Sequence, residues 1–300
     1  MNLETTLGGQ LLRTPLVAAS GTVGSVREWA EVADTTRYGA ATAKSVSPMA
    51  WPGHPAPRMA PTEVGMLNGI GIQNPGIAAW TAEIGPHIGS LDLPVWGSAV
   101  GNSVDDFVAV AKGLHGAGVA AIEVNLSCPN LEGKTMFALD PIASRDVISA
   151  VSEAVPIPIG AKLSPNAVGI SEIAGVVAQA GADWVTLTNT AWGAAIDIEM
   201  RTPKITSIVG GYSGVGLKPI SLRCVIEVYR DLPELPIVGL GGVRSGSDVV
   251  EYLMAGASAV GVGTAHFETP KVGRRIIREF VRWCRAHGVG NVAELIGVAT

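Results

Sequence analysis

The sequence is poor in cysteine and in charged side chains. It has 3 cysteines in 300 residues, and only 16% of its residues are Asp, Glu, Lys or Arg. Cys128, Cys224 and Cys284 lie far apart and form no CxxC pair, so we expect no disulfide framework, zinc site or iron–sulfur cluster within this chain. The histidines show no metal-ligand spacing, and neither GxSxG nor HExxH occurs. We therefore expect no bound metal, and a hydrolase has no support.

Long apolar runs and basic clusters are also missing. No run approaches the length of a membrane span, and the N-terminus does not look like a signal peptide. The formal net charge is −5, and we find no Lys/Arg cluster. We therefore expect neither a membrane nor a nucleic-acid partner, and we expect a cytoplasmic location.

What is abundant is glycine and apolar sequence. The chain has 38 glycines and is 47% hydrophobic, which suits a buried parallel sheet with many tight connections. Short apolar runs of strand length recur along the chain and alternate with helical patterns. The predicted strands are residues 16–19, 40–44, 95–100, 121–126, 157–163, 184–188, 237–240 and 259–262.

Glycines mark the joints between these units. Gly39, Gly118, Gly181 and Gly256 each follow a helical pattern and open a strand, as left-handed helix caps do. Eight strands with as many crossovers predict an α/β fold, a (β/α)8 TIM barrel. Residues 3–12 predict a short N-terminal hairpin, and residues 1–300 are expected to form a single domain. The alternative is a doubly wound sheet, but no GxGxxG follows the first strand.

Polar side chains fall at the predicted carboxyl ends of the strands, where such a barrel carries its active site. Lys44 and Lys162 each end an apolar strand, and a charge there must be paired or bound to a ligand. Glycines follow the last two strands, at the usual phosphate site of this fold. Asn68, Asn125 and Asn189 would suit a planar ligand edged with N–H and C=O groups, such as a pyrimidine; singly, each could be a turn residue.

Three further features remain open at this stage. Residues 45–64 hold five prolines and predict an irregular loop that serves as a lid or a binding wall, or is a surface excursion. Residues 210–214 predict a glycine-rich loop whose backbone can come close to a ligand. Asn74, followed by Pro75, predicts a helix N-cap. Cys128, in a polar turn after a strand, is either packing or a thiol poised to act as a general base.

Four motifs together resemble the dihydroorotate dehydrogenase family. They are NLSCPN at 125–130, MLNGIGIQNPG at 66–76, AKLSPN at 161–166 and GYSG at 211–214, and they occur in family order. The resemblance covers essentially the whole chain. It implies an FMN-containing barrel that oxidises dihydroorotate to orotate in pyrimidine biosynthesis.

The resemblance also implies a subclass. Membrane-bound members use a serine base, whereas this chain has Cys128, as in class 1. AIDI at 195–198, RTP at 201–203, GGYSG at 210–214 and KPI at 218–220 are similar to the NAD-linked type 1B rather than the fumarate-linked homodimeric type 1A. Type 1B catalytic chains form a homodimer core of a heterotetramer with a subunit that carries FAD and a [2Fe–2S] cluster.

The family's functional residues can be carried onto matching positions of this chain. Cys128 would be the catalytic base. The FMN-binding residues would be Ser20, Lys44, Ser45, Ser98, Asn125, Lys162, Thr188, Gly214, Gly241, Gly242, Gly263 and Thr264. The substrate-binding residues would be Lys44, Asn68, Gly69, Ile70, Gly71, Ile72, Asn125, Asn189 and Thr190. The chain departs from the family pattern at Ser98, commonly Asn, at Thr188, commonly Ile, and at the bulky Trp192.

In the mechanism that the resemblance implies, Cys128 removes a proton from C5 of dihydroorotate and a hydride passes from C6 to FMN. Within the family, a class 1A-like fumarate-linked homodimer remains an alternative, and two rival functions remain beside it. One is an FMN-dependent dehydrogenase of another dihydropyrimidine, such as dihydrouracil. The other is a non-redox phosphate-binding barrel in which Lys162 forms a Schiff base.

Overall fold

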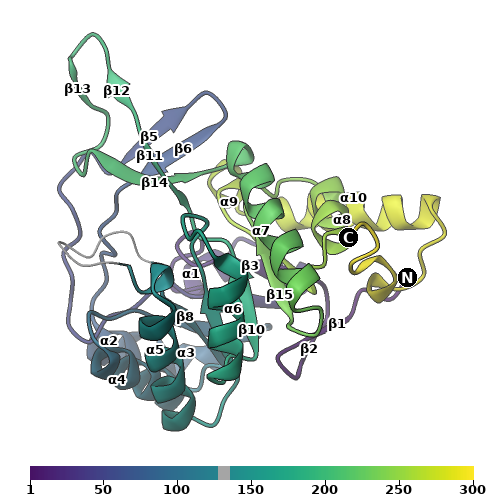
Figure 1. Ribbon diagram of the computed structural model, residues 1–300, viewed down its shortest axis with the longest axis horizontal. Coiled ribbons are helices and arrows are strands. Elements are labelled where there is room, and N and C mark those ends of the chain that lie inside the picture. The colour runs from purple at the N-terminus through teal and green to yellow at the C-terminus, as the bar shows by residue number, and fades with distance from the viewer. Residues whose placement is uncertain (128–135) are drawn as a thin grey trace.

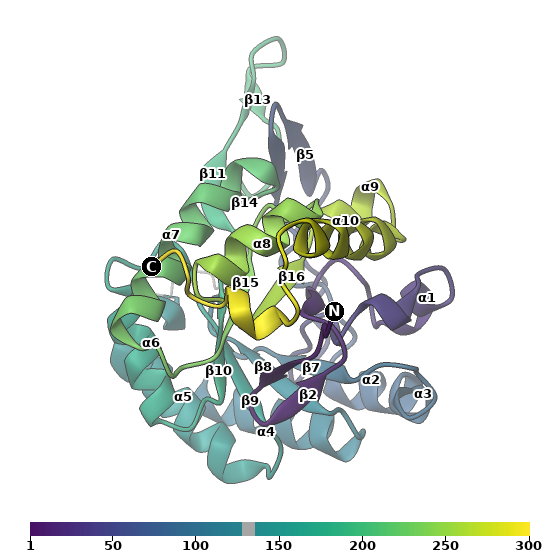
Figure 2. The same cartoon turned by 90° about the vertical axis from the view of Figure 1, so that its right-hand side faces the viewer.

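Eight parallel strands close into a barrel in the computed structural model, which describes residues 1–127 and 136–300. The order around the ring is β10-β15-β16-β3-β4-β7-β8-β9, and each strand agrees with a predicted one to within two residues at either end (Figures 1 and 2). The prediction of a TIM barrel is therefore confirmed. The strands are β3 (Leu16–Ala18), β4 (Ala40–Thr42), β7 (Val95–Ala99), β8 (Ala121–Asn125), β9 (Ile159–Lys162), β10 (Trp184–Leu187), β15 (Ile237–Leu240) and β16 (Ala259–Val262).

Helices cover the outside of the barrel and pack their apolar faces on it. They are α1 (Arg27–Ala30), α2 (Ile77–Glu83), α3 (Gly85–Ile88), α4 (Val104–Gly116), α5 (Pro141–Ala154), α6 (Ile170–Gln179), α7 (Lys218–Asp231), α8 (Gly246–Met254), α9 (Ala265–Glu268) and α10 (Val272–Ala286). Single 3₁₀ turns lie at Thr35–Arg37, Phe137–Leu139, Val215–Leu217 and Val292–Leu295. Among the described residues, no helix has both the length and the apolar character needed to cross a membrane.

The predicted N-terminal hairpin is present and closes one end of the barrel. It consists of β1 (Thr5–Leu7) and β2 (Gln10–Leu12). Leu7 and Leu12 are fully buried in a cluster with Trp96 and Trp184, whose rings lie 4.8 Å apart inside the ring of strands. The end of the barrel nearest the strand N-termini is thus filled with apolar side chains.

Side chains that point into the barrel become more polar toward its other end. On β8, Ala121 belongs to this apolar cluster, which we call the plug. Glu123 lies one layer above it and Asn125 at the rim, because alternate residues of a strand face the same side. The strand register places Glu123 beside Ser98 of β7 and Asn125 beside Lys162 of β9. The polar residues predicted at strand ends therefore share one rim.

A four-stranded antiparallel sheet stands above this rim, and it corrects two predictions. Its order is β11-β14-β6-β5, with β5 (Met59–Thr62), β6 (Gly65–Asn68), β11 (Ala191–Ala194) and β14 (Val209–Ser213). Residues 45–64 are therefore not wholly irregular, because Pro61 is accommodated in β5 at the edge of the sheet. Residues 210–213 belong to β14 rather than to a loop.

Beyond this sheet, the chain extends into a second hairpin. It is formed by β12 (Ile196–Asp197) and β13 (Thr202–Pro203). Figure 1 shows it projecting away from the barrel, at the end opposite β1 and β2. We call residues 191–213, from β11 to β14, the arm.

Two predictions at helix ends are wrong. The backbone of Gly39 is not left-handed; a side chain there would instead collide with the carbonyl oxygen of Thr14, so glycine is required by close approach. Asn74 does not cap a helix, since α2 begins at Ile77. The side-chain oxygen of Asn74 accepts hydrogen bonds from the backbone N–H groups of Ser47 and Gly76, so it ties two loops together.

Gly118, Gly181 and Gly256 do have positive φ, and two of them give a matched stability prediction. Gly118→Ala meets no atom within 4 Å and should cost about 1–2 kcal/mol, from left-handed backbone strain alone. Gly256→Ala would also drive its Cβ into the ring of Tyr229, so overpacking should add about 1–3 kcal/mol. Denaturant unfolding of both variants tests this, and equal losses of stability would contradict it.

Candidate active site

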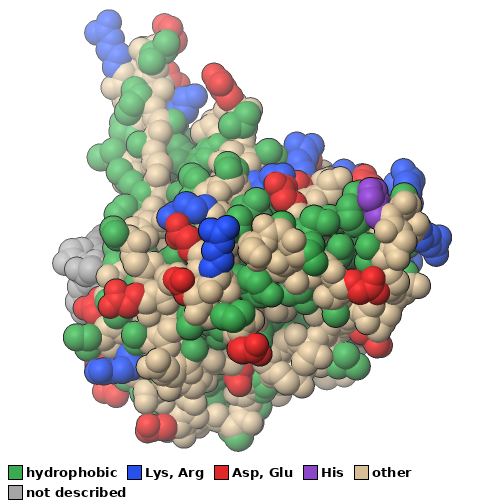
Figure 3. All heavy atoms as spheres, turned by 45° about the vertical axis from the view of Figure 1, so that its right-hand side comes forward, with side chains coloured by type: hydrophobic (Ala, Val, Ile, Leu, Met, Phe, Trp, Pro, Cys, Tyr) green, Lys and Arg blue, Asp and Glu red, His purple; other side chains and the backbone are tan. Residues whose placement is uncertain are grey.

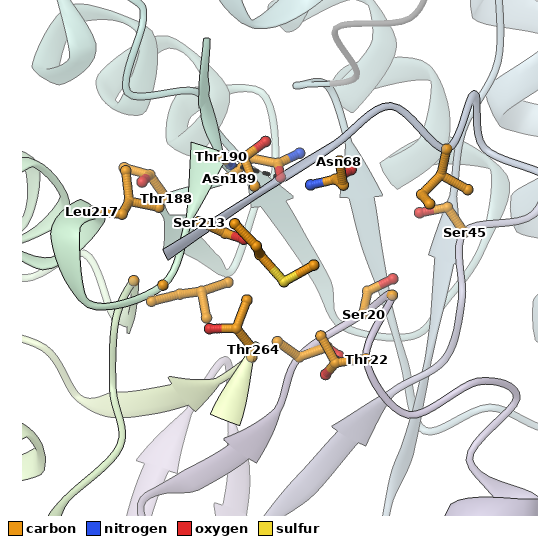
Figure 4. Close-up of a pocket in the computed structure, with 18 of the residues that line it drawn as sticks. Ser20, Thr22, Ser45, Asn68, Thr188, Asn189, Thr190, Ser213, Leu217 and Thr264 are labelled. Carbon is orange, nitrogen blue, oxygen red and sulfur yellow. Dashed lines mark hydrogen bonds between the residues drawn. The ribbon is translucent and has the colours of Figure 1, made fainter. Parts of the chain in front are cut away.

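A cavity of about 470 Å³ opens at the carboxyl ends of the barrel strands, within the usual size range of small-molecule sites. Every barrel strand except β7, or the loop after it, contributes a residue to the lining of this cavity. Ser98 of β7 lies behind the lining and is hydrogen-bonded to Ser45, which does line the cavity. The antiparallel sheet forms the outer wall through Met59, Met66, Asn68 and Ser213. Figure 4 shows Asn68, Asn189 and Thr190 on one side of the cavity and Ser20, Thr22 and Thr264 on the other.

One wall of the cavity, which we call the first wall, is a chain of hydrogen bonds between amide and hydroxyl side chains. Asn189 Nδ2 donates to Ser127 Oγ (2.8 Å), and Ser127 Oγ donates to Asn125 Oδ1 (3.0 Å). Asn125 Nδ2 then donates to Ser45 Oγ (3.2 Å), which shares a hydrogen bond with Ser98 Oγ (2.8 Å). The chain links the ends of β4, β7, β8 and β10. It fixes both asparagine side chains through protein groups alone, and preorganised polar groups give a site its specificity.

A buried ion pair lies beneath this wall. Lys162 Nζ is 3.5 Å from Glu123 Oε1, and the two side chains are only 6% and 3% exposed. Thr186 Oγ1 donates to the other carboxylate oxygen, Glu123 Oε2, at 2.8 Å. Since a buried charge requires compensation, Glu123 allows a lysine to face the cavity at this depth. Glu123 is not among the predicted site residues, although it is a lone acid within an apolar strand.

Glycine backbone without side chains forms the opposite rim, in the loops that follow β14, β15 and β16. Gly241, Gly242, Gly263 and Gly214 all line the cavity. The hydroxyl of Tyr252 donates to the carbonyl oxygen of Gly241 (2.8 Å) and holds that loop in place. A Cβ at Gly263 would meet nothing closer than 3.8 Å, so the backbone there borders open space that a side chain would otherwise fill.

A buried histidine supports the floor next to this rim. His266 Nδ1 lies 3.1 Å from Thr22 Oγ1, and Nε2 lies 2.9 Å from the hydroxyl of Tyr38. Thr22 Oγ1 is also placed to donate to the carbonyl oxygen of Ala19, so a neutral ring with its proton on Nδ1 satisfies the cluster. Burial lowers the pKa of His266 to about 4, which keeps the ring uncharged at neutral pH.

The structure brings most of the predicted site residues together. Those that line the cavity are Ser20, Lys44, Ser45, Asn68, Ile70, Ile72, Asn125, Lys162, Thr188, Asn189, Thr190, Gly214, Gly241, Gly242, Gly263 and Thr264. Ser98 lies behind Ser45, and Gly69 and Gly71 pack against neighbouring loops instead. Trp192 is half exposed on the arm, outside the cavity lining. Cys128 lies outside the described residues.

Several lining residues were not predicted. They are Ala19, Gly21, Thr22, Met59, Met66, Gln73, Ser213, Leu217, Leu240 and Phe267. Met59 and Met66 come from the antiparallel sheet, whose pairing could not be inferred locally. With Leu217 and Leu240, they give the cavity the apolar surface that the face of a planar ring requires.

Comparisons with known proteins agree on one family. A family model described as "Dihydroorotate dehydrogenase" matches residues 2–283. The chain is 40% identical over 298 residues to "Dihydroorotate dehydrogenase B (NAD(+)), catalytic subunit" of Pelobacter propionicus, covering 99% of this chain and 98% of that protein. It is 39% identical over 297 residues to the protein of the same name from Bacillus cytotoxicus, covering 98% and 96%.

A solved structure shares the fold. The crystal structure of DHODH from Eimeria tenella in complex with ferulenol superposes with a TM-score of 0.83 at 22% identity. The match covers 99% of this chain and 88% of that one. At this identity, the likeness supports the barrel architecture alone.

The buried ion pair predicts a non-additive effect on stability. Glu123→Gln leaves Lys162 charged and uncompensated, so it should lower the free energy of unfolding by about 3–5 kcal/mol. Lys162→Met introduced into the same chain removes that charge. The double variant should therefore be more stable than Glu123→Gln alone, as chemical denaturation can measure. Additive losses would show that the pair is not coupled.

The buried histidine predicts acid sensitivity. Its folded pKa of about 4 lies below the unfolded value near 6.5, so the unfolded chain binds more protons between these values. Stability is thus present above about pH 6.5 and is lost as the pH falls toward 4. From pH 7 to pH 5, the unfolding free energy of the wild type should fall about 2 kcal/mol further than that of His266→Gln. Parallel curves would contradict this.

Proposed function

The chain belongs to the dihydroorotate dehydrogenase family, and on that premise we propose that it oxidises dihydroorotate to orotate in pyrimidine biosynthesis. The observation that carries the proposal is the cavity. It joins an amide-lined wall, a charged lysine on its floor and a bare glycine rim. A planar pyrimidine edged with N–H and C=O groups matches the first wall.

FMN is the cofactor we propose for residues 1–300, acting as one domain, because the family is flavin-dependent and the lining fits this molecule. Backbone N–H groups at Gly241, Gly242 and Gly263 suit a phosphate, which such loops bind without side chains. Leu240, Met59 and Met66 offer apolar contact for the faces of a flavin ring. Lys162, held by Glu123, would supply positive charge to a carbonyl edge of the ring.

The substrate would lie against the first wall. Asn68, Asn125 and Asn189, with Thr190, would hold the ring edges of dihydroorotate, and Lys44 would bind its charge. Cys128, three residues beyond Asn125, would take the proton from C5. FMN, when bound, would accept the hydride that leaves C6. Because the asparagines are fixed by their own hydrogen bonds, they would orient both carbons without rearrangement.

The electrons would continue to NAD⁺ through a second subunit. Relatives at about 40% identity carry "B (NAD(+)), catalytic subunit" in their names, and a catalytic subunit implies a partner. The proposed partner carries FAD and a [2Fe–2S] cluster, which the sparse cysteines of this chain do not provide for. The complex would act in the cytoplasm.

The arm supports a homodimer as the core of that complex. Large apolar side chains stay exposed along it: Trp192, Ile196, Ile198, Met200, Ile208 and Val209. Ile198 and Met200, near the tip, are 79% and 71% exposed. An apolar surface of this density marks an interface rather than a solvated hairpin, and a two-fold pairing would cover both copies at once.

The assignment of the base predicts a selective kinetic defect. Cys128→Ala should still bind FMN but should slow flavin reduction by dihydroorotate by about 10²–10⁴-fold, the usual range for loss of a general base. Stopped-flow absorbance of the flavin under anaerobic conditions measures this rate directly.

A matched control comes from a second thiol in the same chain. Cys224 is fully buried in α7, and burial raises its pKa to about 11, so Cys224→Ala should reduce flavin at the wild-type rate. Wild-type speed in Cys128→Ala would exclude Cys128 as the base. Faster bleaching by dihydrouracil than by dihydroorotate would instead favour a different dihydropyrimidine as the substrate.

A further inference from the structure

The outer surface of α10 carries a dense set of basic side chains. Together with Arg37 of the 3₁₀ turn at Thr35–Arg37 and Lys271 just before α10, they line a groove. We call this set the arginine face: Arg37, Lys271, Arg274, Arg275, Arg278, Arg282 and Arg285. The expectation that the chain has no basic cluster is therefore wrong. Six of the seven basic residues lie within residues 271–285, so most of the cluster is present in the sequence, and folding adds Arg37. In Figure 3, blue side chains gather toward the upper right, where α10 lies.

Helical spacing explains why these charges share one side. Arg274, Arg278, Arg282 and Arg285 are three or four residues apart, so they form a stripe along α10. The opposite side is apolar and buried, with Ile276 and Phe280 packed in the core. The contact between α10 and α8 is among the most extensive between elements of the fold. The arginine stripe is thus held in place and faces outward.

Few carboxylates balance this charge. Asp34 pairs with both Arg37 and Arg274, and Glu279 pairs with Arg275. In the described part of the chain, the remaining basic side chains have no carboxylate at ion-pair distance: Lys271, Arg278, Arg282 and Arg285. Like charges four residues apart on a helix repel each other and destabilise it. The isolated chain gains nothing from this repulsion, whereas an anionic partner would relieve it.

The arginine face begins next to the mouth of the cavity. Phe267 of α9 lines the cavity and is 53% exposed, and Thr269, two residues later, lines the arginine groove. Thr264 joins the same rim at the start of α9. A body bound along the first turns of α10 would therefore also cover Phe267 and sit beside the cavity.

We propose that the arginine face is the docking surface for an acidic patch on the electron-transfer subunit. This proposal rests on the proposed function, because it assumes a partner that draws electrons from the cavity. The location of the arginine face beside the cavity favours that partner, since electrons pass only between cofactors that lie close together. Arginine favours a protein carboxylate surface, to which its planar group binds in a bidentate manner. The net charge of −5 disfavours an extended polyanion, which the rest of the chain would repel.

The test reverses two charges on the stripe and two elsewhere. Arg278→Glu/Arg282→Glu is compared with Lys112→Glu/Arg145→Glu, exposed on α4 and α5, so both double variants change the net charge equally. The probe is the FAD and iron–sulfur subunit encoded by the same source organism. Binding to the intact FMN-loaded chain is measured at low and high salt, together with dihydroorotate oxidation by a dye and by NAD⁺.

The stripe variant should bind the subunit at least about 100-fold more weakly, because attraction becomes repulsion at close charge pairs. Its NAD⁺-linked rate should fall accordingly, while its dye-linked rate stays at the wild-type level. The control variant should match the wild type in all three assays. Dye-linked oxidation by the isolated chain tests the proposed function separately, because its absence would contradict that function without bearing on docking.

Three outcomes would overturn the docking proposal. The first is that the stripe variant binds the subunit as tightly as the wild type does. The second is that the source organism encodes no such subunit. The third is that the arginine face binds duplex DNA or phosphatidylglycerol vesicles, and only that binding is lost in the stripe variant.

Discussion

Closure of the parallel barrel is the constraint on which the rest of the structure depends. Once β10 pairs with both β9 and β15, no strand of the ring is left with a free edge, and all eight carboxyl ends meet at one rim. The hairpin and the paired tryptophans fill the other end with apolar side chains. Polar groups that point inward can therefore reach solvent or a ligand only at the rim.

This geometry accounts for a polar wall and a buried charge in an otherwise apolar ring. Each inward-facing position above the plug needs a partner on a neighbouring strand, and the register supplies one. Glu123 of β8 compensates Lys162 of β9 and accepts a hydrogen bond from Thr186 of β10. Asn125, one layer higher, is bound to Ser45 and Ser127. The resulting site is held by hydrogen bonds within the protein, which suits a reaction that requires two adjacent carbons to be placed against a base and an acceptor.

The local sequence predicts the barrel well and the structures above it poorly. Each strand is a short apolar run beside a glycine joint, so its position is encoded within a few residues. The wall of the cavity is not, because Asn68 of β6 pairs with Gly211 of β14, 143 residues away. For the same reason, the local sequence does not predict Met59 and Met66 as cavity residues, and it predicts a loop at Pro61. Ser98 was predicted from the family pattern, but only the structure shows that it supports Ser45 from behind. The basic residues of α10 are close together in the sequence, but only helical geometry shows that four of them share one outward face.

The proposed function depends on the transfer of electrons from dihydroorotate to a flavin held in this cavity. The most direct measurement is an anaerobic titration of the FMN-loaded chain with dihydroorotate, in which flavin absorbance is followed and the product is identified by chromatography. The flavin should be bleached, and orotate should form in an amount equal to the flavin reduced. A chain that binds no FMN, or one whose bound flavin stays oxidised in excess dihydroorotate, would contradict it.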